Sequence, residues 1–149
     1  MASRILVLNG PNLNLLGTRE PDVYGNETLA DIEAKSSKKA ESLGLVVDFR
    51  QTNTEGELVD WVQQAREDAD LIIVNAGAYT HTSVALLDAL KACDVPVIEV
   101  HLSNIHQREE FRHHSYVSKA AVGMICGFGG HGYEMALDAA ARILNNSSE

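Results

Sequence analysis

The chain has 149 residues, 45% of them hydrophobic, and its 12 basic and 21 acidic residues give a formal net charge of −9. This length fits a single domain, residues 1–149, with a sizeable core, and the acidic balance disfavours nucleic-acid binding, which requires a basic surface. The sequence shows neither the order of a signal peptide nor an apolar run near the roughly 18 residues of a membrane span, so we expect a cytoplasmic protein that binds no membrane.

The first half of the chain alternates predicted strands with predicted helices. Arg4–Leu8 is a strand, and a long loop rich in Asn, Gly and Pro follows it to about Glu27. Thr28 is expected to cap a helix whose apolar stripe consists of Leu29, Ile32, Ser36, Ala40 and Leu43. Leu45–Phe49 is the second strand. Thr54–Glu57 indicates a capping box for a helix that buries Leu58, Trp61, Val62 and Ala65.

The second half continues this alternation. The expected strands are Leu71–Val74, Val97–His101 and Ala121–Cys126, and the expected helices are Ser83–Ala92, a short segment near Gln107–Arg112, and Tyr133–Leu144. Five strands alternating with helices predict an α/β, flavodoxin-like three-layer fold with a five-stranded parallel sheet in the order 2-1-3-4-5. In such folds, ligands bind beyond the C-terminal ends of the strands.

Glu99 and His101 interrupt the apolar fourth strand. Since they are two residues apart, their side chains lie on the same face of the strand. Burial of a carboxylate and an imidazole is costly unless each satisfies the other. Glu99 is therefore expected to accept one ring N–H of His101 and to leave the other nitrogen for proton transfer. A core ion pair without a catalytic role is the alternative.

The long first loop carries Arg19 and Tyr24 between Gly17 and Gly25. Loops of this length are often lids. A tyrosine has a pKa of about 10, so Tyr24 could act as a base near neutrality only beside a cation such as a desolvated Arg19. The alternative is that Tyr24 packs against its neighbours and Arg19 is solvated.

Neutral polar residues stand at the ends of the first and third strands. Asn12 and Asn75 suit the stabilisation of an oxyanion, although Asn is also common in turns. His81 could donate a hydrogen bond to a substrate hydroxyl, or it could be satisfied within its own loop. Asp88 follows two helical turns later on the same face and would by itself be a solvated charge.

After the fourth strand, Leu102 and Ser103 offer backbone N–H groups and a hydroxyl, and Arg112 follows in a charged segment. A carboxylate ligand suits this set of donors, whereas the alternative for the charged segment is an exposed helix face. The run Gly127–Gly132 matches G-x-G-x-x-G but follows the last strand, so it favours a tight turn over a dinucleotide site. Neither the histidines nor the two cysteines show metal-ligand spacing.

These residues together resemble the type II 3-dehydroquinate dehydratases, from about Ile5 to Leu144. The resemblance consists of several long motifs in the same order: N-G-P-N-L-N-L-L-G at Asn9–Gly17, R-E-P-x-x-Y-G at Arg19–Gly25, N-A-G-A-Y-T-H-T-S at Asn75–Ser83, E-V-H-L-S-N-I at Glu99–Ile105 and R-E-x-F-R-H-x-S at Arg108–Ser115.

The resemblance implies anti elimination of water from 3-dehydroquinate through an enolate, giving 3-dehydroshikimate in the shikimate pathway or in quinate breakdown. It implies neither a metal, a cofactor nor a covalent intermediate. Tyr24 would be the base, held as phenolate by Arg19, and His101, oriented by Glu99, would be the general acid. Asn12 would stabilise the enolate oxygen through a water molecule.

For substrate binding, the resemblance implies that the carboxylate is held by Asn75, Leu102 and Ser103 and the ring hydroxyls by His81 and Arg112. Asp88 would reach a neighbouring subunit's site, since members of the family assemble trimers into dodecamers. The residues themselves disfavour the Schiff-base alternative, because none of the five lysines is placed at the C-terminal end of a predicted strand.

A flavodoxin-like binding or signalling module is the competing interpretation. A receiver domain needs acidic residues at the ends of the first and third strands, where this chain has Asn9 and Asn75. A flavin-binding protein would be expected to have a Ser/Thr-rich phosphate loop after the first strand and aromatic side chains around the ring. That loop is absent, and aromatic residues make up only 5% of the chain.

Overall fold

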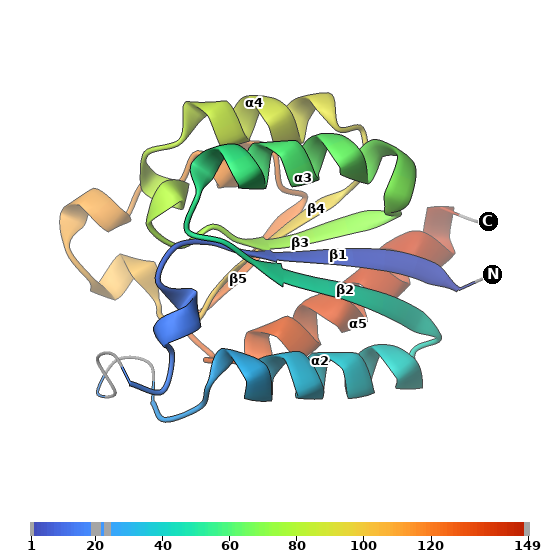
Figure 1. Ribbon diagram of the computed structural model, residues 1–149, viewed down its shortest axis with the longest axis horizontal. Coiled ribbons are helices and arrows are strands. Elements are labelled where there is room, and N and C mark those ends of the chain that lie inside the picture. The colour runs from blue at the N-terminus through green and yellow to red at the C-terminus, as the bar shows by residue number, and fades with distance from the viewer. Residues whose placement is uncertain (1, 19–21, 23–24, 148–149) are drawn as a thin grey trace.

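The described part of the chain, residues 2–18, 22 and 25–147, forms one parallel sheet of five strands in the computed structural model. The strand order is β2-β1-β3-β4-β5 (Figure 1), which confirms the predicted order and the flavodoxin-like arrangement. The strands are β1 (Ser3–Asn9), β2 (Leu45–Gln51), β3 (Leu71–Asn75), β4 (Val97–His101) and β5 (Gly123–Cys126).

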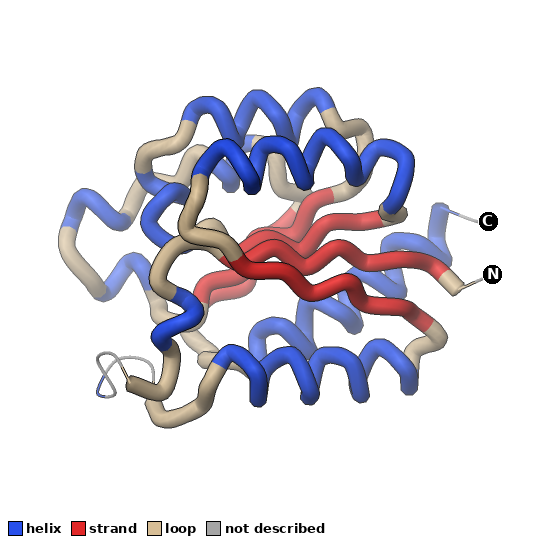
Figure 2. Tube along the Cα trace, in the orientation of Figure 1, coloured by secondary structure: helices blue, strands red, loops and turns tan. Residues whose placement is uncertain are grey.

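Helices cover both faces of the sheet, which gives the three layers seen in Figure 2. Helices α2 (Leu29–Ser42) and α5 (His131–Ser147) lie on one face, and α3 (Glu55–Asp68) and α4 (Val84–Ala92) lie on the other. Short 3₁₀ helices occupy the connections: η1 (Leu13–Leu15), η2 (Gly77–His81), η3 (Ile105–Gln107), η4 (Glu110–Arg112) and η5 (Val117–Lys119).

Alternation of side chains along each strand divides the core into two clusters. On β1, Ile5 and Val7 pack with α2 and α5, whereas Leu6 and Leu8 pack with α3 and α4. All four are buried, because a central parallel strand is covered by helices on both faces. The same alternation decides on which face each polar residue at a strand end will lie.

The predicted Thr28 cap of α2 is confirmed. Its hydroxyl accepts from the Asp31 backbone N–H at 3.1 Å, and the Asp31 carboxylate accepts from the Thr28 N–H at 3.0 Å. The capping box predicted at Thr54 is wrong. The Thr54 side chain makes no capping hydrogen bond, and its backbone N–H donates to Thr52 Oγ1 at 3.1 Å, which satisfies that donor from within the preceding loop.

Two further predictions need correction. Trp61 is half-buried and lies at the surface of α3, where the Arg50 guanidinium is 5.4 Å from its ring centroid. The short helical segment expected near residues 107–112 consists of two separate 3₁₀ turns, η3 and η4. No helix of the described part is both long and apolar enough to cross a bilayer.

The carboxyl ends of all the strands meet at one edge of the sheet, on the left in Figure 1. There Asn9 is in register with Asn75 on the neighbouring strand, and His101 is in register with Cys126. The first part of the connection after β4, with η3 and η4, extends beyond this edge. The fold thus gathers at one place the polar strand ends that the sequence separates.

Candidate active site

A cavity of about 100 Å³ opens at the C-terminal edge of the sheet. Most of the predicted site residues line it: Asn12, Asn75, His81, His101, Leu102, Ser103 and Arg112. Glu99 lies beneath the cavity as the partner of His101. Arg19 and Tyr24 lie outside the described residues.

The Glu99–His101 pair is buried at the end of β4, with the two side chains only 1% and 5% exposed. His101 Nε2 donates a hydrogen bond to Glu99 Oε2, which confirms the contact predicted from their spacing on the strand. Because Nε2 is occupied in this way, Nδ1 is the ring nitrogen that His101 can offer to a ligand in the cavity. In the imidazolium form, Nδ1 carries a proton that it can donate.

Two hydroxyl groups complete the surroundings of Glu99. Ser115 Oγ donates to Glu99 Oε2 at 2.7 Å, and Ser118 Oγ donates to Oε1. Burial alone would raise the pKa of Glu99, but the hydrogen bond and charge of His101 and the two serine hydroxyls outweigh it and lower that pKa below its ordinary value. Glu99 is therefore a carboxylate near neutral pH, able to accept the hydrogen bond from His101.

A neutral network lies on the opposite face of the sheet. The Tyr133 hydroxyl, from α5, donates to Asn9 Oδ1 at 2.6 Å and accepts from Asn75 Nδ2 at 2.9 Å. Asn75 Oδ1 in turn accepts from the Gly77 backbone N–H at 3.2 Å. All three side chains are buried, and only Asn75 lines the cavity. The network thus holds in place Asn75, the one of these three residues that lines the cavity.

His81 Nδ1 donates to the backbone carbonyl oxygen of His114 at 2.7 Å. Burial lowers the pKa of His81 below its ordinary value, and the hydrogen bond to His114 only partly opposes this. A neutral ring with its proton on Nδ1 has a lone pair on Nε2. In the neutral ring the free nitrogen of His81 is therefore an acceptor, and the predicted donation to a hydroxyl would need a proton on Nε2 as well.

Asn12 has features of both roles considered for it, a turn residue and a hydrogen-bonding group at the site. Its backbone has φ 69°, in the left-handed region that Asn tolerates in turns, and its N–H donates to Asn53 Oδ1 at 3.0 Å. Its side chain nevertheless makes no hydrogen bond to another described residue and lines the cavity. Within the described residues, the backbone N–H groups of Leu102 and Ser103 are likewise without hydrogen-bond acceptors.

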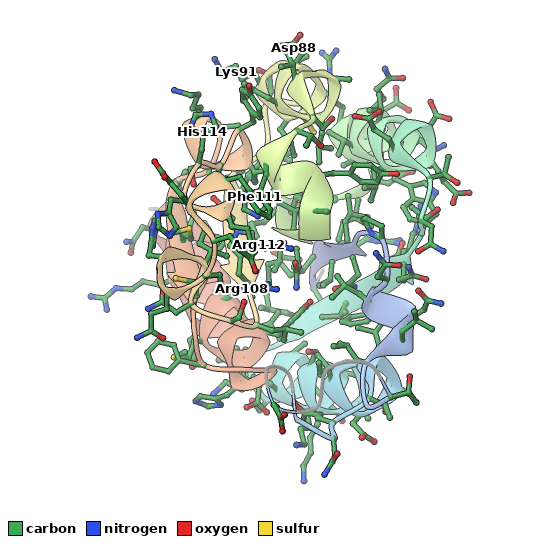
Figure 3. The ribbon with its side chains drawn as sticks, turned by 90° about the vertical axis from the view of Figure 1, so that its left-hand side faces the viewer. Asp88, Lys91, Arg108, Phe111, Arg112 and His114 are labelled. Atoms are coloured by element: carbon green, nitrogen blue, oxygen red, sulfur yellow. The ribbon has the colours of Figure 1, made fainter. Side chains whose placement is uncertain are left out.

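Two of the residues that line the cavity are arginines, Arg108 and Arg112, which Figure 3 labels close to each other. Arg112 Nε donates to Glu109, and the Arg112 guanidinium carbon is 5.0 Å from the Phe111 ring centroid. These two contacts restrain Arg112 and leave its terminal nitrogens for an anion or a hydroxyl. The cavity is therefore locally positive although the chain as a whole is acidic.

Asp88 is the one described site prediction that the structure places away from this cavity. It is exposed on α4, and Figure 3 shows it far from Arg108 and Arg112. Within one chain, this carboxylate therefore does not reach the cavity.

Several residues at the site were missed by the sequence analysis. Ser115 and Ser118 could have been sought as donors, because a buried carboxylate needs more than one hydrogen bond. Tyr133 lies on the buried face of α5, where a hydroxyl requires a partner. Nothing in the sequence pattern distinguishes Arg108 from its charged neighbours.

The arrangement combines a proton donor, neutral hydrogen-bonding groups and two cations around a small cavity. It suits proton transfer on a small anionic substrate that bears hydroxyl groups. Among the described residues, no three His, Cys, Asp or Glu side chains are grouped so that they could hold a metal ion.

Comparison with known proteins gives one consistent family. A model of the family described as dehydroquinase class II matches residues 3–141. A 3-dehydroquinate dehydratase 2 from Pseudomonas aeruginosa is 62% identical over 138 residues, which cover 93% of each chain. A 3-dehydroquinate dehydratase from Dinoroseobacter shibae is 62% identical over 134 residues, covering 90% of this chain and 89% of that protein. The crystal structure of type II dehydroquinase from Propionibacterium acnes superposes with a TM-score of 0.91 at 47% identity, covering 95% and 98% of the two chains.

Proposed function

Because the chain belongs to the dehydroquinase class II family, we propose that the cavity at the end of β4 is where it dehydrates 3-dehydroquinate, with His101 as the general acid. The chain is a 3-dehydroquinate dehydratase of type II, whose reaction belongs to the shikimate pathway or to quinate breakdown. The observation that carries the assignment of the site is the buried Glu99–His101 pair beneath a cavity lined by hydrogen-bonding and cationic groups.

The first chemical step is removal of a proton from C2, beside the ketone of the substrate. We assign this step to Tyr24, held as phenolate by Arg19, on the motif R-E-P-x-x-Y-G that both residues belong to. Lowering a tyrosine pKa by about 2–3 units takes roughly 3–4 kcal/mol of differential stabilisation, which a desolvated guanidinium can supply. The electrons move to the ketone oxygen, and Asn12, whose side chain is uncommitted at the cavity, stabilises the enolate through a water molecule.

The second step is loss of the C1 hydroxyl as water. His101 donates its Nδ1 proton to the departing oxygen while Nε2 stays hydrogen-bonded to Glu99. The hydrogen bond to Glu99 holds the His101 ring in one orientation. Electrons of the enolate form the C1=C2 double bond, so neither a metal nor a covalent intermediate is required.

Substrate binding divides between the two ends of the cavity. The substrate carboxylate is held by the Asn75 Nδ2 proton that does not go to Tyr133 and by the N–H groups of Leu102 and Ser103, which have no acceptor among the described residues. The ring hydroxyls lie against His81 and Arg112. His81 accepts from one hydroxyl through Nε2, and Arg112 donates to another.

The same proposal includes the assembly. We expect residues 1–149 to act as one catalytic domain in the cytoplasm, as a homo-oligomer in which trimers build a dodecamer and Asp88 serves a neighbouring subunit's site. Its support here is the exposure of Asp88 away from its own cavity and the exposed apolar side chains of Val122, Phe128 and Phe111. Sedimentation analysis tests it, because a monomer in solution would contradict the proposal.

One experiment tests the reaction itself. The protein is mixed with 3-dehydroquinate, and the conjugated product is followed by its ultraviolet absorbance. Turnover should persist with a metal chelator and with borohydride added together with the substrate. Loss of activity in the chelator would indicate a metal, and loss in borohydride would indicate an imine.

Tyr24→Phe tests the base. Turnover should fall strongly while substrate binding and the fold are largely retained, because only the phenol oxygen is removed. Steady-state kinetics together with circular dichroism checks this. Turnover at the wild-type level would remove Tyr24 from the mechanism.

A further inference from the structure

We propose that Tyr133 is a positioning residue for substrate binding, which fixes the Asn75 amide so that Asn75 presents an N–H donor, and not its carbonyl oxygen, to the substrate carboxylate. The inference rests on the proposed function, because it deepens the binding role assigned there to Asn75. It assigns a task to a buried residue of α5 that does not itself line the cavity.

The hydrogen bonds of this network form a chain from Arg50 through Asn9, Tyr133 and Asn75 to Gly77. Arg50 fixes which group donates and which accepts at the first end of this chain. Its backbone carbonyl oxygen can only accept, so the Asn9 group that faces it at 2.9 Å is the Nδ2 amide. Asn9 therefore turns its Oδ1 toward Tyr133 and accepts from the hydroxyl at 2.6 Å. A hydroxyl has one proton, and this bond uses it. Toward its other neighbour, Asn75, the Tyr133 oxygen can only accept.

The other end is fixed by Gly77. Its backbone N–H can only donate, and it lies 3.2 Å from Asn75 Oδ1. The two ends require the same orientation of the Asn75 amide, with Nδ2 on the Tyr133 oxygen at 2.9 Å and Oδ1 on the Gly77 N–H. In the reversed orientation, the carbonyl oxygen would lie against an oxygen without a proton, and the Nδ2 group would lie against the N–H of Gly77.

This polarity determines what Asn75 can offer to a ligand. An amide nitrogen has two protons, and Tyr133 takes one of them. The second has no acceptor among the described residues, and Asn75 lines the cavity. A carboxylate has only acceptors, so it gains from this N–H and would be repelled by the amide oxygen. Together with the N–H groups of Leu102 and Ser103, the cavity then has three donors of the same polarity.

Burial keeps the network in this one state. Asn9, Asn75 and Tyr133 are 0%, 3% and 1% exposed, so water does not compete for their hydrogen bonds. Burial also raises the pKa of Tyr133 well above its ordinary value, and the hydroxyl therefore keeps the proton that it donates to Asn9. A phenylalanine would fill the same space and pack against Phe49, whose ring centroid is 6.1 Å away, but could not fix the amide.

The test is the steady-state kinetics of Tyr133→Phe. Loss of one well-oriented hydrogen bond to the substrate carboxylate predicts an increase in KM of about tenfold. The turnover number should change little, because the carboxylate is bound alike in the ground state and the transition state. Ile5→Val, a core substitution in the same hydrophobic cluster, is the matched control, and its KM should equal that of the wild type even where its stability is lower.

A double-mutant cycle separates positioning from general destabilisation. If Tyr133 acts through Asn75, Tyr133→Phe should raise KM in the wild-type background and not in the Asn75→Ala background. An equal increase in both backgrounds, or an unchanged KM in folded Tyr133→Phe while Asn75→Ala raises it, would overturn the inference and leave the proposed function intact. An unchanged KM in Asn75→Ala would instead overturn the binding role of Asn75 and the inference with it.

Asn9→Ala provides a second test that does not alter Tyr133, in case Tyr133→Phe does not fold. Without the Asn9 acceptor, the Tyr133 proton is free to turn toward Asn75, so the orientation of the amide is no longer imposed from that side. KM should again rise without a matching loss of turnover. A wild-type KM in folded Asn9→Ala would contradict the inference.

Discussion

Two polar clusters meet at the C-terminal edge of the sheet, on opposite faces. On the α3/α4 face, the charged pair Glu99–His101 is held by two serines of the η5 region. On the α2/α5 face, Asn9, Asn75 and Tyr133 form a neutral network. The charged cluster contains the side chain that transfers a proton, His101. The neutral cluster transfers no proton and only orients the N–H donors of Asn75.

This difference has a physical basis. Charged partners of low exposure respond strongly to pH, because each depends on the charge of the other. A neutral network changes only when one of its hydroxyl or amide groups ionises or is removed. The sheet thus separates the pair that includes the proton-transferring His101 from the neutral network that orients Asn75, although Asn75 and His101 both line the same cavity.

Removal of the acid should have the largest effect. His101→Ala should lower kcat by about 10²–10⁴-fold, the usual contribution of general acid catalysis. Steady-state rates with 3-dehydroquinate measure this. His131→Ala is the matched control, since it removes an imidazole that pairs with Glu134 on α5, away from the cavity, and it should leave kcat unchanged.

Glu99→Gln should show how much the negative charge of Glu99 contributes to stability, because glutamine has nearly the same shape but no charge. Taking one charge from a buried pair costs about 3–5 kcal/mol. The pKa of Glu99 is lowered in the folded protein, so its contribution to stability is present above the ordinary glutamate value of 4.5 and is lost as the pH falls below it. Urea unfolding across this range should show a smaller loss of stability at acid pH in Glu99→Gln than in the wild type.

Glu109→Gln is the exposed counterpart of that substitution. Its carboxylate also has a lowered pKa, because it accepts a hydrogen bond from Arg112, but the side chain is 53% exposed. We expect only a small change in stability, which shrinks further in high salt. A loss as large as that of Glu99→Gln would show that exposure does not weaken the Glu109–Arg112 pair.

Ser115→Ala and Ser118→Ala each remove one hydrogen bond to the Glu99 carboxylate. A hydrogen bond to a charged group contributes about 1.5–3 kcal/mol, so each variant should unfold at lower urea concentration. The two serine hydroxyls also help to lower the pKa of Glu99, so their removal should change the pH profile of kcat. An altered stability with an unchanged profile would limit the serines to a structural role.

The neutral cluster should respond only at alkaline pH, and this is the smallest of the expected effects. Burial raises the pKa of Tyr133 above its ordinary value of 10, so the unfolded chain ionises first. The contribution of Tyr133 to stability is complete below pH 10 and declines above it. Unfolding measured between neutral and alkaline pH should show this decline in the wild type and a smaller one in Tyr133→Phe.

The comparison of the clusters also shows what made a site residue predictable. Glu99 and His101 are two residues apart on one strand, so the period of the strand places them together. Asn9, Asn75 and Tyr133 come from three elements separated by 66 and 58 residues, and no local spacing relates them. Ser118 was missed for the same reason, because its hydroxyl reaches Glu99 from a later connection.

The sequence by itself determined the order of strands and helices, the topology of the sheet and the edge at which polar residues gather. These follow from hydrophobic periodicity and from the handedness of parallel crossovers, which are properties of short segments and their order. Local patterns were less reliable at details that depend on neighbours, as the Thr54 cap shows, where Thr52 supplied the partner instead.

Only the tertiary structure decided which atoms of these residues are free to act. His81 has its Nδ1 on a carbonyl oxygen 33 residues away, which makes its other nitrogen an acceptor. Asn75 is oriented by Tyr133 and Gly77, and His101 has its Nε2 on Glu99. Donor and acceptor roles are set by partners that pack together only after folding, because a hydrogen bond depends on distance and direction and not on separation along the chain.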